Sequence, residues 1–311
     1  MKRVLHFLLT LIGLSVIAVG AIYFIYPGVI LSTIQSLSVK GAGLEHRQVD
    51  INGYQAHYYE GGSENQDTVV LLHPFTEDKS SFVTSVRTLT QRYRVILPDL
   101  QGHGDNTQLI GRDYSIQGQR AFIEKLLQKL NANRVFIGGN EMGGHIALAF
   151  TARSAKKTLG LILINTSGIS QANGSTYEPL PNTIDTAYFA DKFTRLYVTP
   201  PTYPKPILQY LANQLNPKIN FFNDMLKQME SGDDFQLDNK TTSIIAPTLI
   251  LWGLKDPILS SKIATRLENT LANATLKKMD NAGRSPQFEL PDLVGGEINA
   301  FLDKIQRSRL E

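Results

Sequence analysis

One stretch constrains this chain more than any other: residues 135–144, which read Val-Phe-Ile-Gly-Gly-Asn-Glu-Met-Gly-Gly. An apolar strand pattern runs into a glycine-rich turn and continues as a helix of small residues. Glycine is needed there because a sharp strand-to-helix turn leaves no room for side chains on either side. The residue at the apex, Glu141, is therefore expected to stand exposed above the sheet, with backbone N–H groups pointing toward it.

Further segments fit around this turn in a fixed order. They are 46–59, which alternates around Asn52-Gly53, the apolar run 68–72 that ends in His73-Pro-Phe75, the loop 99–105, the run 247–253 that leads to Asp256, and 281–286 with Arg284. The first predicts a hairpin, and residues 80–92 and 114–130 are expected to be helical. Strands that alternate with helices predict a mainly parallel, doubly wound sheet.

In order and spacing these motifs resemble the α/β-hydrolase superfamily, close to its bacterial lipases and esterases, from about residue 43 to the C-terminus. The resemblance implies an α/β-hydrolase fold whose nucleophile elbow is the glycine-rich turn. It places Glu141 at the nucleophile position, Asp256 at the triad acid and Arg284 at the base. Phe75 and Met142 would supply the oxyanion-hole N–H groups. The family carries Ser at the first of these positions and His at the third.

The histidines offer no displaced base. They are His6, His46, His57, His73, His103 and His145. None follows Asp256, although the triad of this fold runs nucleophile, acid, base in chain order. His145, one helical turn beyond Glu141, is interpreted as a packing residue, and His73 and His103 as partners of backbone groups. No two of these three share a metal-ligand spacing, so no metal and no cofactor is expected.

Arg284 cannot take a proton from a nucleophile, because the pKa of a guanidinium lies above about 12. Glu141 could attack as a carboxylate, as Asp does in related dehalogenases and epoxide hydrolases, but its ester would then accumulate for want of a base. A guanidinium between the carboxylates of Glu141 and Asp256 instead satisfies charges that are costly to bury. The favoured prediction is a non-catalytic protein that binds a lipid-like or small apolar ligand, or a protein partner. The alternative is a carboxylic-ester hydrolase with a non-standard site, such as a Glu141 nucleophile.

The N-terminus predicts a membrane anchor. The expected order is a cytoplasmic tip (1–3), a transmembrane signal anchor (4–26), a stalk (27–44) and the hydrolase-like domain (45–311), with an inserted cap at about 170–239. The anchor would be about 34 Å long as a helix, enough to span a bilayer. Lys2 and Arg3 would keep the tip cytoplasmic and place the domain in the periplasm. A cleaved signal peptide, which would release a secreted protein, is the alternative, but the apolar run is longer than such peptides need.

Composition sets the outer limits. The 311 residues, 42% of them hydrophobic, suffice for one large α/β domain with an insertion. A formal charge of +3 without basic clusters argues against nucleic acid as a partner. The absence of Cys excludes a thiol nucleophile, a thiolate metal site and disulfides. The expected cap is rich in Pro, Tyr and Phe, which suits a lipid-like ligand and equally suits packing onto the sheet.

Overall fold

The computed structural model describes residues 24–63, 66–171 and 177–310, together with positions 2, 4, 6, 8–10 and 20. An eight-stranded sheet in the order β1-β2-β4-β3-β5-β6-β7-β8 forms its centre. The strands are β1 (Leu44–Ile51), β2 (Tyr54–Gly61), β3 (Thr68–Leu72), β4 (Arg94–Pro98), β5 (Val135–Glu141), β6 (Thr158–Thr166), β7 (Thr248–Gly253) and β8 (Ala274–Met279). From β4 to β8 the neighbours are parallel, so the expected mainly parallel sheet is confirmed.

The antiparallel edge of the sheet is the hairpin that the sequence predicts. Ile51 of β1 pairs with Tyr54 of β2, and the two residues between them have positive φ, 56° at Asn52 and 82° at Gly53. Asn and Gly are the residues that adopt this conformation most readily, and such a turn matches the twist of the strands on either side. The hairpin joins the parallel strands through β2, which pairs antiparallel with β4.

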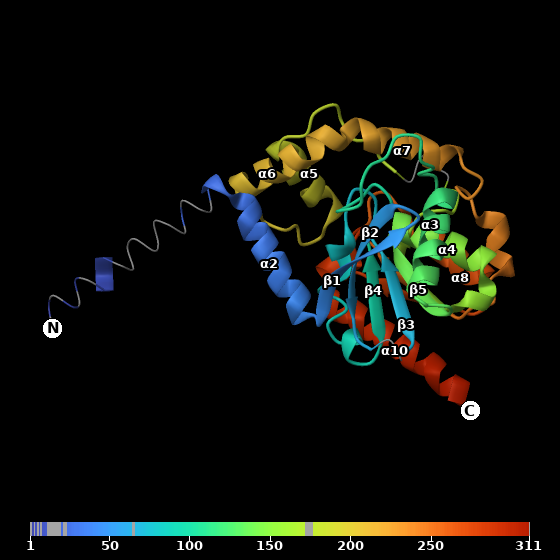
Figure 1. Cartoon of the computed structure of the whole chain (residues 1–311). Helices are drawn as coiled ribbons and strands as arrows, with labels where there is room; N and C mark the ends of the chain where they lie inside the picture. Colours follow the sequence, from blue (N-terminus) through green and yellow to red (C-terminus); the bar gives the residue numbers. More distant parts are fainter. Residues whose placement is uncertain are drawn as a thin grey trace.

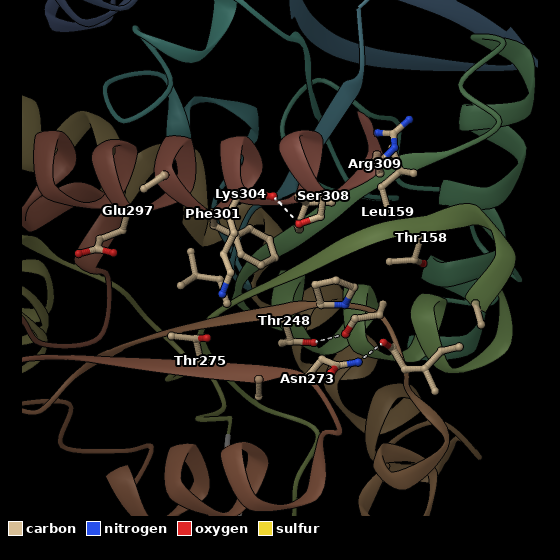
Figure 2. Close-up of a pocket in the computed structure, with 18 of the residues that line it drawn as sticks. Thr158, Leu159, Thr248, Asn273, Thr275, Glu297, Phe301, Lys304, Ser308 and Arg309 are labelled. Atoms are coloured by element: carbon tan, nitrogen blue, oxygen red, sulfur yellow. Dashed lines mark hydrogen bonds between the residues drawn. The ribbon is translucent and has the colours of Figure 1, made fainter. Parts of the chain in front are cut away.

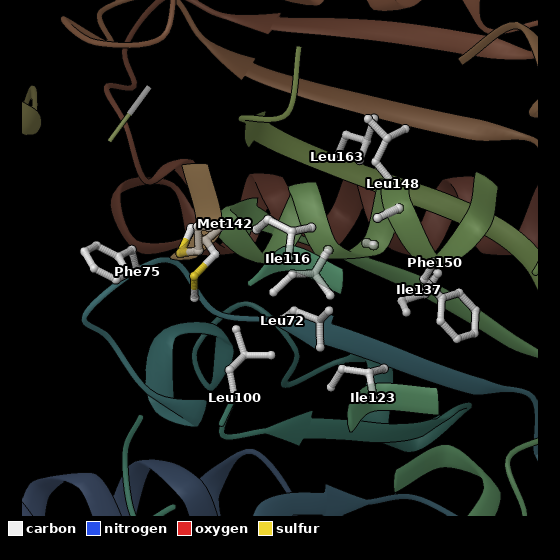
Figure 3. Packing of buried hydrophobic residues seen from close by; sticks show 14 of the residues in the cluster. Leu72, Phe75, Leu100, Ile116, Ile123, Ile137, Met142, Leu148, Phe150 and Leu163 are labelled. Carbon is white, nitrogen blue, oxygen red and sulfur yellow. The ribbon is translucent and has the colours of Figure 1, made fainter. Parts of the chain in front are cut away.

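Helices cover both faces of the sheet (Figure 1). They are α2 (Pro27–Gly41), α3 (Ile116–Lys129), α4 (Met142–Arg153), α5 (Thr186–Leu196), α6 (Lys205–Leu215), α7 (Ile219–Ser231), α8 (Ser261–Thr270), α9 (Pro286–Glu289) and α10 (Pro291–Leu310). Alternate residues of β3 belong to different cores. Val70 and Leu72 lie in the core that also contains residues of α3, α4 and α8, whereas Val69 and Leu71 lie in the core that contains residues of α10. Figure 3 shows the first of these cores, with Leu72, Ile137 and Leu148 drawn from β3, β5 and α4.

The segment between β6 and β7 contains α5, α6 and α7, where the sequence predicts an inserted cap. Figure 1 shows these helices gathered over one end of the sheet, and the described residues 177–243 are called the helical insertion below. Phe222, Met225 and Met229 of α7 are buried in the same core as β3 and β5. Part of the aromatic and methionine content of the insertion therefore packs it onto the sheet.

The residues expected to form a stalk are largely helical. Pro27 opens α2, where its fixed φ and missing N–H are tolerated, and Val39 and Ala42 at the other end are buried in the second core. The predicted anchor at 4–26 falls mainly outside the described residues. Within the part of the chain that the structure describes, no helix has the length and apolar character needed to cross a bilayer.

One expected helix is absent. Residues 80–92 form two short 3-10 helices, η1 (Lys79–Phe82) and η2 (Leu89–Gln91), joined by turns. Hydroxyl side chains in this stretch bind nearby carbonyl groups: Ser81 donates to Asp78 and Ser85 to Phe82. Such local bonds compete with α-helix formation, and the prediction of one continuous helix was wrong for this reason.

Candidate functional site

Glu141 lies at the sharp turn between β5 and α4. It is the last residue of the strand and the N-cap of the helix, with φ 51° and ψ −110°. Positive φ is unusual for a residue with a side chain, and it marks backbone strain held by the surrounding structure. The flanking glycines make the turn possible, because a Cβ at Gly143 would overlap the carbonyl oxygen of Leu72 and one at Gly139 would overlap the backbone of Gly143. The local geometry is that of a nucleophile elbow, but the Glu141 side chain is only 5% exposed, because Arg284 and the Phe75 loop pack against it, so the expectation that it stands exposed above the sheet is wrong.

The loop after β3 brings a donor to the Glu141 side chain. The N–H of Phe75, which follows the rigid Pro74, points into the site and donates to Oε2 of Glu141 across 2.9 Å. The donor that the sequence assigns to an oxyanion hole thus binds the carboxylate of the same chain. Met142, the second expected donor, is the first residue of α4, and its side chain lies in the core near that of Phe75 (Figure 3).

Asp256 follows β7 and is held rigidly. Its Oδ1 accepts from the N–H groups of Ile258 and Leu259 at 2.8 and 3.0 Å. Its Oδ2 accepts from the amide of Asn165 at 2.9 Å. Asn165, at the end of β6, also binds both backbone groups of Gly253. The Asp256 side chain is completely buried, and three neutral donors stabilise its charge.

Arg284 lies between the two carboxylates. Its Nη2 donates to Oε1 of Glu141 at 2.6 Å, and its Nη1 lies 3.8 Å from Oδ1 of Asp256. Only about 9% of the Arg284 side chain is exposed. Burial by itself lowers the pKa of Arg284, but Glu141 and then Asp256 oppose it, and the pKa lies above its ordinary value. The guanidinium therefore stays charged and cannot accept a proton.

Asn140 fixes the loop that carries Arg284. This fully buried amide donates to the carbonyls of Ile164 and Arg284 at 2.9 and 3.0 Å. Its oxygen accepts from Gln287 at 3.0 Å. The N–H of Arg284 in turn donates to the carbonyl of Leu196, at the end of α5. The position of the guanidinium is thus set by both the sheet and the helical insertion.

A small cavity of about 60 Å³ adjoins the ion cluster of Glu141, Arg284 and Asp256. Beyond Glu141 and Arg284 it is lined by Pro74, Phe75, Thr76, Glu77, Glu178, Leu180, Tyr188, Lys192, Leu196, Tyr197, Ile258 and Ser285. Burial is the main cause of two pKa shifts there: it raises the pKa of Glu77 and lowers that of Lys192. Sites for drug-sized ligands usually measure about 300–1,000 Å³, so an acyl chain would have to displace side chains of the insertion.

A larger cavity, of about 890 Å³, lies at the opposite end of the sheet (Figure 2). Thr158, Thr248 and Ala274, which open β6, β7 and β8, all line it. Glu141 instead closes β5, and these strands are parallel. In open α/β sheets ligands bind outside the carboxyl ends of the strands, so the smaller cavity is the candidate functional site.

The histidines near the site are engaged elsewhere. His145 is fully buried between the hydroxyl of Tyr177, 3.1 Å from Nδ1, and the carbonyl of Asp234, 2.8 Å from Nε2. Burial lowers its pKa to about 4. His73 accepts the N–H of Leu100, and His103 binds the carbonyl of Gln101. Their interpretation as packing residues and backbone partners is confirmed.

Two charged residues of the site were not identified from the sequence. Glu77 follows the Phe75 loop, and its carboxylate accepts from the hydroxyl of Ser81 at 2.7 Å. Lys192 comes from α5 of the insertion. The sequence pattern places the insertion near the elbow, but it does not say which face of an insertion helix points down. The acidic position of Glu77, just after the motif, is the one hint that could have been followed.

A family model described as alpha/beta hydrolase fold matches residues 67–291 of the chain. The chain belongs to the α/β-hydrolase fold family. Among the relatives of this hydrolase-fold chain, Lipase 1 of Psychrobacter immobilis is 27% identical over 81% of this chain and 82% of that lipase. Monoacylglycerol lipase ABHD6 of Homo sapiens is 22% identical over 96% of this chain and 94% of its own.

Solved structures give the same family. A membrane phospholipase A, described as a bacterial virulence factor, superposes with a TM-score of 0.85 at 30% identity and covers 98% of this chain and 99% of that one. A putative lipase from Acinetobacter baumannii AYE superposes with a TM-score of 0.82 at 26% identity, over 89% of this chain and 97% of its own. The resemblance to lipases of the α/β-hydrolase superfamily is therefore confirmed.

Proposed function

We propose that this chain is a lipase-type member of the family that does not hydrolyse esters and instead binds a lipid-like or small apolar ligand beneath the helical insertion. One observation carries the proposal: the carboxylate at the elbow is bound both by Arg284 and by the N–H of Phe75. The nucleophile position and one expected oxyanion donor thus satisfy each other. A lipase needs that donor free for the transition state.

The base position supports the same conclusion. A serine-type mechanism needs a group of pKa near the working pH to take and return a proton. Arg284 has a raised pKa and is fixed as a cation by two carboxylates. Asp256, at the acid position, is held in place by three donors. It lies where a triad acid would orient an imidazole, but Arg284 occupies the position of the histidine.

The ligand class rests on relatives and on the cavity. The relatives are named as lipases, a monoacylglycerol lipase and a phospholipase A, all of which are names for enzymes of acyl-glycerol chemistry. Leu180, Tyr188 and Leu196 of the insertion give the cavity an apolar side. We propose attachment to the inner membrane through residues 4–26 with the domain in the periplasm. This would place the site close to such lipids.

Activity assays test the non-hydrolytic part. Purified protein should not react with a fluorophosphonate probe, and it should cleave p-nitrophenyl esters of any chain length no faster than a heat-denatured sample. The Glu141→Ala variant is the control for an unusual nucleophile. Multiple turnovers that Glu141→Ala abolishes would reject the proposal and establish the competing function, a carboxylate-nucleophile hydrolase.

Binding is tested separately. Monoalkylglycerol ethers cannot be hydrolysed and mimic the neutral substrates of the lipase relatives, so they should raise the melting temperature by an amount that grows with the logarithm of the ligand excess. A Leu180→Arg variant would place a charge on the apolar side of the cavity and should remove the shift. An unchanged melting temperature with ethers of both short and long chains would exclude the lipid-like ligand, whatever the activity assays show.

A further inference from the structure

Two histidines and an aspartate meet on the outer surface of the hairpin, away from the Glu141 cluster. His46 of β1 pairs with Tyr59, and His57 of β2 pairs with Gln48. The two histidines are therefore diagonal neighbours on one face of the β1–β2 ribbon, because side chains two residues apart share a face. Asp105, at the end of the loop after β4, reaches the same place.

The separations of their polar atoms match those of a metal site. Nε2 of His46 lies 3.3 Å from Nδ1 of His57 and 3.6 Å from Oδ2 of Asp105. One ligand atom from each residue lies within 4.8 Å of the others. Zinc binds imidazole nitrogen and carboxylate oxygen at about 2.0–2.2 Å in a tetrahedron, so neighbouring ligand atoms lie about 3.3 Å apart. The side chains of His46 and Asp105 are exposed and that of His57 is partly buried, so rotations about their side-chain bonds can bring the three ligand atoms to one ion.

We propose that His46, His57 and Asp105 form a Zn²⁺ site that pins the hairpin to the loop at residues 99–105. The ligands would be Nε2 of His46, Nδ1 of His57 and the carboxylate of Asp105, with solvent in the fourth position. This ligand set, two imidazoles and one carboxylate, suits Zn²⁺ better than Mg²⁺ or Ca²⁺, which prefer oxygen ligands. About half of the His46 side chain is exposed, so the ion can enter from solvent.

The charges around the site allow a divalent cation. Lys79 is the nearest competitor, since its Nζ lies 2.7 Å from Oδ2 of Asp105 and 2.6 Å from Oδ2 of Asp99. The carboxylates of Asp99 and Asp105 outnumber the single ammonium of Lys79, so these three side chains together carry a net negative charge. Oδ2 of Asp105 is both the oxygen 3.6 Å from His46 and the one bound by Lys79, so the ion would share this oxygen with Lys79 or take Oδ1 after the carboxylate rotates.

The consequence reaches the candidate functional site. Asp99 accepts from the backbone N–H of Lys79, and Lys79 opens η1, directly after the loop that carries Phe75 and Glu77. An ion on Asp105 would tie the hairpin to this network. The spacing of histidines along the chain, considered alone, predicts no metal site. The hairpin register joins two histidines eleven residues apart, which no spacing motif describes.

Zinc titration of the full chain tests the site. After removal of metal with EDTA, calorimetry should show one Zn²⁺ per chain, and Co²⁺ should give the visible absorption of a tetrahedral complex. Zinc should also raise the melting temperature, because it binds the folded state alone. His46→Gln and His57→Gln should each weaken binding by about tenfold or more, a difference of about 1.4 kcal/mol, and Asp105→Asn should weaken it as well.

The matched control is Gln48→Ala. Gln48 is exposed, lies two residues from His46 on the same face of β1 and pairs directly with His57, so its loss should leave zinc affinity unchanged. Circular dichroism checks that each variant is folded. The proposal is overturned if the wild type binds no zinc, if binding survives in the His46→Gln/His57→Gln double variant, or if Mg²⁺ competes at equal concentration.

Discussion

The side chain of Glu141 makes two bonds that a serine could not make together. Its carboxylate spans the distance between the N–H of Phe75 and the guanidinium of Arg284, with one oxygen for each. A serine offers one oxygen on a shorter arm. At the scale of the residue, the elbow is present and its occupant binds two neighbouring groups of the same chain.

Restoring the two family residues tests this account. Glu141→Ser alone should stay inactive, since the hydroxyl would face Arg284, and it should lower the free energy of unfolding by about 3 kcal/mol because a buried cation loses its nearest partner. Arg284→His alone should also be inactive. The double variant Glu141→Ser/Arg284→His regains a nucleophile, a base and the Asp256 that would orient it.

The double variant should label with a fluorophosphonate and cleave short p-nitrophenyl esters, at rates that the two single variants do not reach. Asp256→Asn in the double variant is the control, because it should remove most of the gain. A folded double variant that stays inert would mean that the triad is not the only part of a lipase site that is missing, and the Phe75 loop, stiffened by Pro74, would be the first suspect.

His145 predicts a pH dependence of stability. Its pKa is about 4 in the folded state, against the ordinary value of 6.5 that it regains on unfolding, so between these values the unfolded chain binds more protons. The contribution of the neutral His145 side chain to the free energy of unfolding is complete above pH 6.5. It is lost as the pH falls toward 4, by about 3 kcal/mol in total. Urea unfolding at pH 7 and pH 4.5 should show the decrease. His145→Gln should reduce the slope, and an unchanged slope would contradict the assignment to His145.

At the scale of the element, the junction of β5 and α4 requires the backbone of α4 to lie very close to the backbone at the end of β3. Gly143→Ala would press a methyl group into the carbonyl of Leu72 and should lower the free energy of unfolding by about 3 kcal/mol. Gly296→Ala in α10 is the matched control, since nothing lies within 4 Å of its added methyl, and it should stabilise by up to about 1 kcal/mol. Equal effects of the two changes in chemical denaturation would refute the steric argument.

Elements with a local chemical cause were predictable from the sequence. Asn52-Gly53 specifies its hairpin, and the glycines around Glu141 specify the turn, since no other residue fits there. The structure of residues 80–92 was not predictable in this way, because serine hydroxyls bind backbone carbonyls there and shorter turns replace the expected helix. Bonds of this kind depend on rotamers, which hydrophobic periodicity does not report.

Some residues of the candidate site were predictable from the sequence and others were not, for the same reason. The positions of Glu141, Asp256 and Arg284 follow from strand order, because the carboxyl ends of parallel strands meet at one edge of a sheet. Glu77 and Lys192 could not be placed, since they depend on the path of a loop and on the facing of α5. The pair His46 and His57 required the hairpin register, although the hairpin itself was predicted.

At the scale of the whole molecule, attachment to a membrane is a prediction about residues 4–26. Lys2 and Arg3 precede an uncharged apolar run, so the full chain should remain with membranes after alkaline carbonate extraction, with its domain accessible to protease from the periplasm. Removal of residues 1–26 should release the domain into the soluble fraction. Recovery of a natural soluble form that begins near Ala21 would show a cleaved signal peptide instead.

The bond between Glu141 and Phe75 has a consequence for selectivity. A carboxylate fixed beside its donor competes with any incoming anion at a high effective concentration, which is about millimolar for short flexible tethers and far higher when the geometry is fixed. A free fatty acid would have to displace this internal anion and would meet its negative charge. A neutral ester or ether need displace nothing charged. We therefore expect the proposed ligand site to prefer neutral lipids to free fatty acids, because the Glu141 carboxylate already occupies the donor that an acid would need.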